Sequence, residues 1–282
     1  MQNMKRILVP VDFSPTSKKA FRFAANIISK SGGAILLYHL YTPGKEATLV
    51  SKENIYEYNK RIQETILKRL QRLKKKVLED TAEVTVSTIV GRTPVIDNIL
   101  GFAEHNHVDM IIMGTQGASG LKKVTVGSVA AKVVAKADIP VLLVPEKFEW
   151  KLPENIVFTS SFHKADRKAL PVAFEITKLY EALLTLVHIS DPGDLLTEAN
   201  KNNFEIYAYR LQRELNDIRI QFKQLSTTSI VRTMENFHEE IPYDLLVMAR
   251  RKLGFFDRFF QGSFTKKMAY ITTFPLLVVP EE

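Results

Sequence analysis

The chain carries one pattern twice, and this repeat constrains its fold more than any other feature. The residues "ILVPVDFS" at 7–14 recur as "IVFTSSFH" at 156–163, an offset of 149. At the same offset, "ILLYHL" at 35–40 recurs as "LTLVHI" at 184–189. Self-similarity at a fixed offset is typical of a duplicated structural unit.

A second offset extends the repeat over the rest of each copy. From Gly91 to Pro145 an offset of 135 holds without a gap, and it places "IPVLLVP" over "FPLLVVP". The junction, "EKFEWKLPEN", is polar and contains a proline. We therefore predict two tandem domains, at residues 1–147 and 151–282, each of ordinary domain size.

Strand and helix patterns alternate within a copy. "RILVPVD" is a short β-branched apolar run of the kind that is buried on both faces of a sheet. In the segment that follows, Ser14 suits a helix N-cap, Pro15 suits the first helical position, and Gly32 with Gly33 suits the helix end. Further helices are expected around 53–78, 94–106 and 127–137. This order predicts an α/β fold in which each domain is a five-stranded parallel sheet with helices on both faces.

Composition and charge restrict the class of protein. A hydrophobic content of 45% and a charged content of 25% are those of a soluble globular chain. No apolar run reaches the ~18–20 residues that span a bilayer, and the start lacks the pattern of a signal peptide, so we expect a cytoplasmic protein without a membrane partner. Without cysteine, disulfides and thiolate metal sites are excluded.

The positive charge lies in the first half of the chain. Residues 1–147 hold 22 Lys and Arg against 13 Asp and Glu, a net of +9, whereas the remainder has a net of −1. Much of the excess is the run "KRLQRLKKK" at 68–76, inside a helical pattern. We interpret it as a solvated helix face and do not expect nucleic acid as a partner.

A glycine pattern follows the predicted strand "DMIIM". Its spacing is Gly114-x2-Gly117-x9-Gly127-Ser128. The first two glycines would let the turn fold tightly and expose backbone N–H groups, and Gly127-Ser128 would begin a helix whose N-terminus favours an anion. Two such donor clusters suit a di- or triphosphate, although the same glycines could serve only a turn and a cap.

The sequence resembles the universal stress protein family over nearly its whole length, as a tandem two-domain member. The resemblance rests on "ILVPVDFSP", "LLYHL", "DMIIMGTQGASG…GSVAAKVV" and "IPVLLVP". It implies an adenine-nucleotide α-hydrolase-like, Rossmann-like fold and a stress-response function. In that family the glycine pattern marks members that bind ATP, so the resemblance implies ATP, with or without Mg²⁺, as the ligand of the first domain.

The resemblance also implies which residues of the first domain contact the nucleotide. The adenosine part would meet Asp12 with Pro10 and Val11, and Leu40 would line the adenine pocket. The ribose and phosphates would be held by Met113, Gly114, Gly117, Gly127, Ser128 and Val129. One departure is Ala130, where a hydroxyl is common in the family, and its absence implies a somewhat lower affinity.

The second copy departs much further from this pattern. Ser161 stands at the position of Asp12, and Ala249 and Lys252 replace the two loop glycines with two arginines between them. Only Gly262-Ser263 survives. We expect the second motif to be degenerate. The alternative is that its arginines and lysine bind a different anion.

Three classes of function remain open. The first is a regulatory module that binds ATP and signals to a protein partner not identified by the sequence. The second is an enzyme with at most weak ATP hydrolysis, for which we find no P-loop, no pyrophosphatase loop and no catalytic residue to name. The third is an interaction protein that binds no nucleotide.

Other candidate residues have ordinary structural interpretations. His39 and His188 occupy equivalent strand positions and are expected to pack there. His105 and His107 have no third metal ligand nearby in sequence, so we expect no metal site. The phenylalanines of "GFFDRFFQGS" at 254–263 are expected to pack in a core or to form an interface.

The last strand of each copy predicts how the copies associate. Both strands are apolar and would lie at a sheet edge, where an open edge favours pairing. Single-domain relatives dimerise through this strand, so the resemblance implies an intrachain pseudo-dimer. A homodimer of the whole chain is left open.

Overall fold

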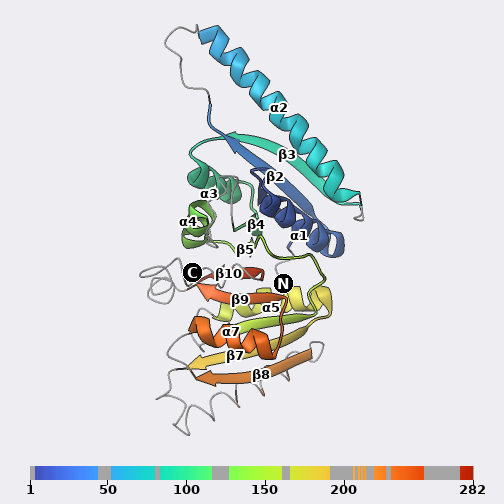
Figure 1. Ribbon diagram of the computed structural model, residues 1–282, viewed down its shortest axis with the longest axis vertical. Helices are drawn as coiled ribbons and strands as arrows, with labels where there is room; N and C mark the ends of the chain where they lie inside the picture. The colour runs from blue at the N-terminus through green and yellow to red at the C-terminus, as the bar shows by residue number, and fades with distance from the viewer. Residues whose placement is uncertain are drawn as a thin grey trace. The chain divides into compact units, whose positions relative to one another are not determined.

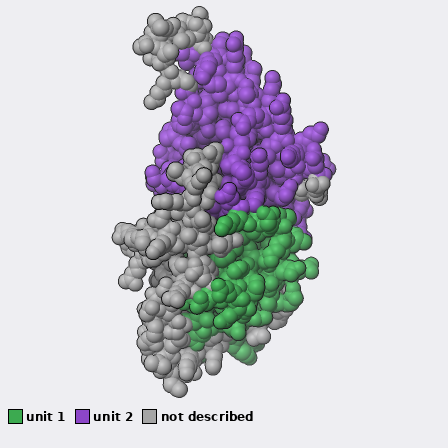
Figure 2. All heavy atoms as spheres, in the orientation of Figure 1, with its two compact units in different colours: residues 1, 147–282 green, residues 2–146 purple. Residues whose placement is uncertain are grey.

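The protein forms two compact units, one of residues 2–146 and one of residues 147–282 (Figure 2). The computed structural model describes residues 4–43, 52–79, 83–115, 127–160, 166–190, 219–226, 230–250 and 274–281, with 206, 209, 211 and 213. None of the helices within these ranges is long and apolar enough to cross a membrane.

The first unit alternates strands and helices along the chain. Its sheet has the order β3-β2-β1-β4-β5 with every pair parallel (Figure 1). Helices α1 and α2 contact each other, as do α3 and α4. The elements are β1 Arg6–Pro10, α1 Pro15–Ser31, β2 Ala34–Tyr41, α2 Lys52–Leu78, β3 Thr85–Arg92, α3 Val95–His105, β4 Met110–Gly114, α4 Ser128–Lys136 and β5 Val141–Val144.

The second unit repeats this topology. Its sheet has the order β10-β9-β6-β7-β8, again with parallel pairs. The described elements are β6 Asn155–Ser160, α5 Asp166–Tyr180, β7 Leu183–Ser190, β8 Arg219–Ser226, α7 Ile230–Glu240, β9 Leu245–Arg250 and β10 Leu276–Pro280. Ile7 pairs with Ile35, and at an offset of 149 Ile156 pairs with Leu184. The predicted duplication of a parallel α/β domain is confirmed.

Local signals define the first helix. The Ser14 hydroxyl accepts the Ser17 N–H at 3.2 Å, and Pro15 occupies the first turn. At the other end, Gly32 has a φ of 73° and its N–H donates to the Ile28 carbonyl at 2.8 Å. Only glycine adopts this left-handed backbone readily, so the sequence fixes where α1 ends.

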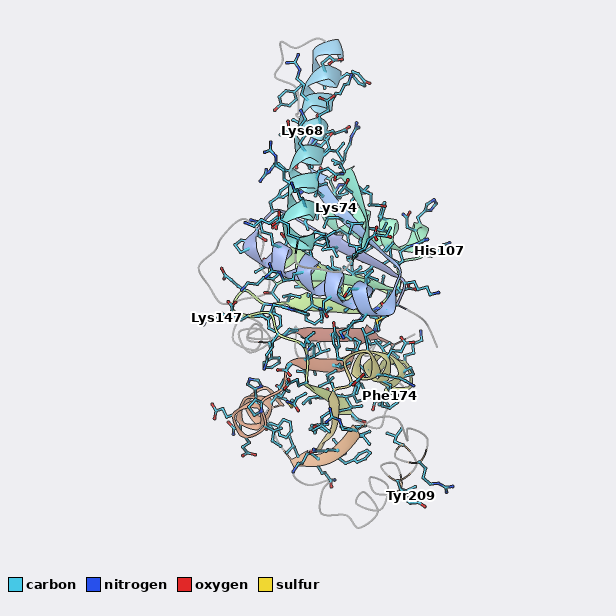
Figure 3. The ribbon with its side chains drawn as sticks, turned by 90° about the vertical axis from the view of Figure 1, so that its right-hand side faces the viewer. Lys68, Lys74, His107, Lys147, Phe174 and Tyr209 are labelled. Atoms are coloured by element: carbon cyan, nitrogen blue, oxygen red, sulfur yellow. The ribbon has the colours of Figure 1, made fainter. Side chains whose placement is uncertain are left out.

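Helix α2 buries apolar side chains over its C-terminal half. The buried side chains there are Ile66, Leu70, Leu73 and Val77. The N-terminal end stands clear of the sheet in Figures 1 and 3, and it exposes Tyr56. Within the basic run, Lys68 is exposed, whereas the Lys74 ammonium donates to the Val86 carbonyl of β3 at 2.9 Å (Figure 3).

An aspartate ties the start of the first strand in each unit. The Asp109 carboxylate, just before β4, accepts the backbone N–H groups of Lys5 and Arg6 at 3.0 and 2.8 Å. Its counterpart Asp244 accepts two N–H groups at the start of β6, at 2.8 and 2.9 Å. Asp244 also forms an ion pair with Lys151. Such bonds fix the register of two strands that are far apart in sequence.

Candidate functional site

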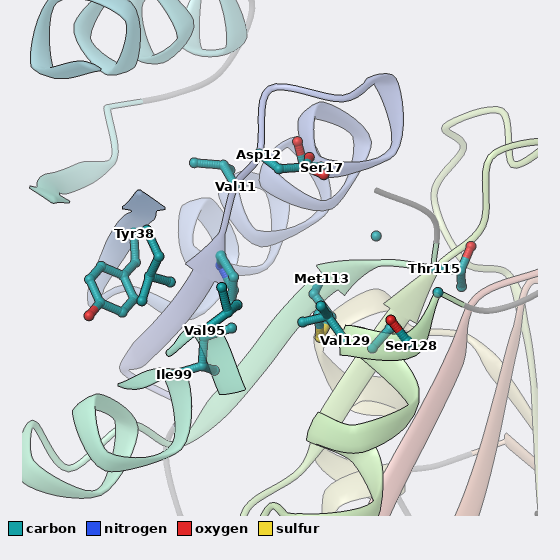
Figure 4. A pocket seen from close by; sticks show the side chains of 15 residues that line it. Val11, Asp12, Ser17, Tyr38, Val95, Ile99, Met113, Thr115, Ser128 and Val129 are labelled. Atoms are coloured by element: carbon teal, nitrogen blue, oxygen red, sulfur yellow. The ribbon is translucent and has the colours of Figure 1, made fainter. Parts of the chain in front are cut away.

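A pocket of about 240 Å³ opens at the carboxyl ends of the strands of the first unit (Figure 4). Ligands of open parallel sheets bind at this edge. The pocket is lined by nine of the ten residues singled out in the sequence: Pro10, Val11, Asp12, Leu40, Met113, Gly114, Gly127, Ser128 and Val129. The tenth, Gly117, lies outside the described residues. Segments more than 100 residues apart thus meet around one cavity.

Six further lining residues were not among those predicted to contact the ligand. They are Ser17, Tyr38, Val95, Ile99, Thr115 and Ala130. Strand periodicity could have found Tyr38, because residues two apart in a strand share a face and Leu40 was named. Val95 and Ile99 lie one turn apart on α3 and could have been found by helical spacing. Figure 4 shows Tyr38, Val95 and Ile99 on one side, and Thr115 and Ser128 on the other.

The Tyr38 ring makes a rigid apolar wall. It stacks on Phe102 of α3 with ring centroids 4.6 Å apart. A Cβ on Gly91 of the neighbouring strand would overlap the Tyr38 ring, so glycine there makes room for it. Burial raises the pKa of the Tyr38 hydroxyl, which therefore stays neutral at physiological pH. This side of the pocket suits a flat apolar group.

The turn between β1 and α1 is held from several sides. The Asp12 carboxylate accepts the Ser14 N–H at 3.0 Å. Phe13 has a φ of 65°, a left-handed conformation that is costly for a bulky residue. Its ring lies 4.7 Å from the His39 ring and 4.1 Å from the guanidinium carbon of Arg69 on α2. These contacts on Phe13 keep Asp12 in place at the pocket.

The strand-end histidines play the same part in both units. His39 Nδ1 lies 2.7 Å from the Val11 carbonyl, and His188 Nδ1 lies 3.1 Å from the Ser160 carbonyl, the equivalent atom. A carbonyl only accepts, so Nδ1–H donates in each case. Burial lowers the pKa of both histidines, so both are neutral at physiological pH. We interpret them as ties between neighbouring strands rather than as bases.

Gly114 is required by a close approach of α1. A Cβ at this position would lie 2.6 Å from the Thr16 hydroxyl oxygen and 2.9 Å from the Thr16 backbone carbonyl carbon. Packing between β4 and the first turn of α1 is thus a reason for this glycine beyond the tight turn expected from sequence. In the second copy Ala249 stands at the position of Gly114, and Ala165 stands at the position of Thr16.

The start of α4 supplies the polar end of the pocket. Gly127 is its N-cap and gives no side-chain hydrogen bond, and the first turn holds no acidic residue. The first bond within the helix runs from the Ala131 N–H to the Gly127 carbonyl at 3.0 Å. The N–H groups of residues 128–130 therefore have no acceptor within the helix. Together with the helix dipole they favour an anion.

The second unit places different chemistry at the equivalent positions. Asp166, at the position of Ser17, is 4% exposed, and its carboxylate accepts the Ser160 hydroxyl at 2.7 Å. Arg250 stands at the position of Thr115. Residues 161–165 and 251–273, which include Lys252, Gly262-Ser263 and the phenylalanines of 254–263, lie outside the described residues. A buried carboxylate at this place disfavours an anionic ligand.

Comparison with known proteins relates both units to one family. The universal stress protein family model matches residues 3–145 and again residues 154–280. A universal stress protein of Methanocaldococcus jannaschii is 30% identical over 159 residues, which are 51% of this chain and 96% of the relative. The universal stress protein YxiE of Bacillus subtilis is 30% identical over 149 residues, 49% of this chain and 97% of the relative.

A solved structure covers both units at once. The crystal structure of a universal stress protein from Archaeoglobus fulgidus matches 99% of this chain and 97% of its own, with a TM-score of 0.72 and 18% identity. A putative universal stress protein of Pseudomonas aeruginosa matches 99% and 94%, with a TM-score of 0.67 and 14% identity. At this level of identity the likeness supports the fold.

Proposed function

Because the chain belongs to the universal stress protein family, as a tandem member with two domains, we propose that its first domain binds ATP. In this proposal the protein is a cytoplasmic stress-response module whose nucleotide occupancy is read by a protein partner. The pocket at the ends of β1, β2 and β4 is the binding site. Mg²⁺ would accompany the triphosphate.

One observation carries the proposal: nine residues drawn from four separate segments line one pocket whose two ends differ in chemistry. The apolar end, with Tyr38, Val95 and Ile99, suits the adenine base. The α4 N-terminus suits the phosphates, because its N–H groups of residues 128–130 have no acceptor within the helix. In this proposal Asp12, between the strands and α1, would accept a hydrogen bond from a ribose or base donor.

Two measurements test the proposal directly. Nucleotide released from the freshly purified protein by denaturation is identified by mass spectrometry. Calorimetric titration of the nucleotide-free protein with Mg·ATP then gives the affinity and the stoichiometry. If no nucleotide co-purifies and the titration shows no binding, the proposal is wrong, and the glycines serve only the turn and the helix cap.

The stoichiometry should be near one ATP per chain. Asp166 adds a buried carboxylate to the second unit, and the repeat puts the long side chain of Lys252 at the position of Gly117. Both changes oppose the binding of a phosphate at that site. Saturation at two per chain would show that the second domain accepts nucleotide in spite of them.

Turnover separates the binding module from the enzyme. Among the pocket residues of Figure 4, Asp12 is the acidic one and His39 is not part of the lining. His39 Nδ1 is also committed to the Val11 carbonyl. We therefore expect phosphate release from Mg·ATP to stay close to that of a protein-free control. A faster rate that falls on substitution of a lining residue would favour the ATPase alternative.

The pairing of the two copies is part of the same proposal. In their own sheets β5 and β10 are terminal strands, both apolar and buried. We propose that the copies associate through these strands as a pseudo-dimer. A fragment of residues 1–147 that sediments as a monomer at tens of micromolar would argue against this pairing.

A further inference from the structure

Thr115 follows β4 and lies where the pocket meets the start of α4. Its N–H donates to the Val144 carbonyl at 3.0 Å, and its carbonyl accepts the Gly127 N–H at 2.5 Å. The backbone of Thr115 thereby connects the end of β5 to Gly127, the N-cap of α4. Backbone hydrogen bonds thus hold the main chain of this residue on both sides.

The Thr115 side chain has a polar atom that these contacts do not use. The residue is 0% exposed, and its Oγ1 has no hydrogen-bond partner among the residues that the structure describes. A buried hydroxyl without a partner destabilises a protein, because it loses the hydrogen bonds that it makes to water in the unfolded chain. The fold gains nothing from this hydroxyl that valine, which has the same shape, would not supply.

The second copy supports this view. The repeat places Arg250, the last residue of β9, at the position of Thr115. A hydroxyl is therefore not a requirement of the fold at this point. The hydroxyl occurs in the first unit, which is also the unit that carries the glycine pattern.

The Thr115 hydroxyl belongs to a residue that lines the pocket. Thr115, Gly127, Ser128 and Ala130 line the same cavity, and Figure 4 shows Thr115 and Ser128 on the same side of it. The first turn of α4 supplies backbone donors there, and Ala130 offers no hydroxyl. We propose that Thr115 Oγ1 donates a hydrogen bond to a phosphate oxygen of the nucleotide and so makes the pocket prefer nucleotides to nucleosides. This inference rests on the proposed nucleotide function.

Substitution of Thr115 tests the inference in the full-length chain. Hydrogen bonds to charged groups are worth enough that Thr115→Val should weaken Mg·ATP binding by about 10-fold or more. Adenosine, which has no phosphate, should bind the variant within about twofold of the wild-type affinity. The ligand-free variant should melt no lower than the wild type. Thr115→Ser, which keeps the hydroxyl, should bind ATP nearly as well as the wild type.

Thr177→Val is the matched control. Thr177 is also 0% exposed, but its hydroxyl donates to the Ala173 carbonyl at 2.7 Å in the second unit. This variant should melt at a lower temperature and bind ATP normally, the reverse of Thr115→Val. The two valine variants therefore separate the loss of a structural hydrogen bond from the loss of a ligand contact.

Three results would decide against the inference. Unchanged ATP affinity in Thr115→Val overturns it and leaves the proposed function standing. Equal losses for ATP and adenosine overturn it too, because the hydroxyl would then shape the whole pocket. A wild-type protein that binds neither ligand removes the proposed function and the inference with it. If the valine variant does not fold, Thr115→Ser against Thr115→Ala gives the same comparison at equal volume.

Discussion

Replacement of Gly114 by alanine tests how tightly α1 packs on β4. The added Cβ would lie 2.6 Å from the Thr16 hydroxyl oxygen, 2.7 Å from the Thr16 Cβ and 2.9 Å from its backbone carbon. Contacts under 3.0 Å force a displacement, and overpacking of this kind costs about 1–3 kcal/mol. Glycine-to-alanine replacement recovers about 0.4–1 kcal/mol from the unfolded chain. We expect a net loss of about 1–2 kcal/mol in the free energy of unfolding.

A second substitution shows which atoms cause the loss. Thr16→Ala removes the hydroxyl but leaves the Cβ and the backbone carbon of residue 16 in place. It also removes the hydrogen bond between the Ser14 and Thr16 hydroxyls, 3.0 Å apart. Added to Gly114→Ala, the substitution Thr16→Ala should therefore restore less than half of the lost free energy of unfolding. Because Asp12 lies just before α1, the displaced helix should also weaken Mg·ATP binding.

Urea denaturation followed by circular dichroism measures these differences in the full-length chain. Gly101→Ala is the control, because Gly101 lies in the interior of α3 and a Cβ there would meet nothing within 4 Å. That variant should gain about 0.5–1 kcal/mol, the usual advantage of alanine over glycine in a helix. A Gly114→Ala protein as stable as the wild type would refute the argument from close approach. Full recovery of stability in the Gly114→Ala, Thr16→Ala double variant would show that the clash involves the Thr16 hydroxyl alone.

Gly117→Lys, which copies residue 252 into the first domain, should abolish ATP binding with little change in the melting temperature of the nucleotide-free protein; unchanged affinity in a titration would contradict this. Asp109→Ala should cost about 2 kcal/mol in urea denaturation, because two backbone N–H groups at the start of β1 lose a charged acceptor, and a cost near zero would mean that water replaces it. Burial lowers the pKa of His39, His188 and His238 in the folded chain. As the pH falls, these histidines therefore take up protons in the unfolded chain before they do so in the folded chain. Stability should be level above about pH 7 and fall as the pH drops below about 6.5. A urea midpoint that stays constant from pH 7.5 to 5.5 would argue against these three shifts.

The sequence was sufficient wherever the cause of a structure is local. Ser14 and Pro15 begin α1 and Gly32 ends it, since caps depend on neighbours a few residues away. The topology followed from the repeat and from the alternation of strand and helix patterns. The pocket residues were named from the resemblance to the family, and their meeting at one edge agrees with the rule that ligands of parallel sheets bind at the carboxyl ends of the strands.

Contacts between distant residues were not predictable in the same way. The stacking of Tyr38 on Phe102 and the approach of Thr16 to Gly114 depend on how helices settle on the sheet. No pattern in the chain predicts the left-handed backbone of Phe13, or that the Thr115 hydroxyl has no hydrogen-bond partner among the described residues. These features arise in packing, where shape rather than residue type decides.

Both units have a histidine that donates to a carbonyl at the end of the neighbouring strand, and this repetition has a practical value. Because both units belong to one chain, they are always present in equal amounts and in the same solution. The effect of a substitution in one unit can therefore be compared directly with the effect of the same substitution in the other. A substitution of His39 and the same substitution of His188 should perturb the two folds alike. Only the first should change a ligand-dependent signal, so comparing the pair measures how strongly the strand end is coupled to the pocket.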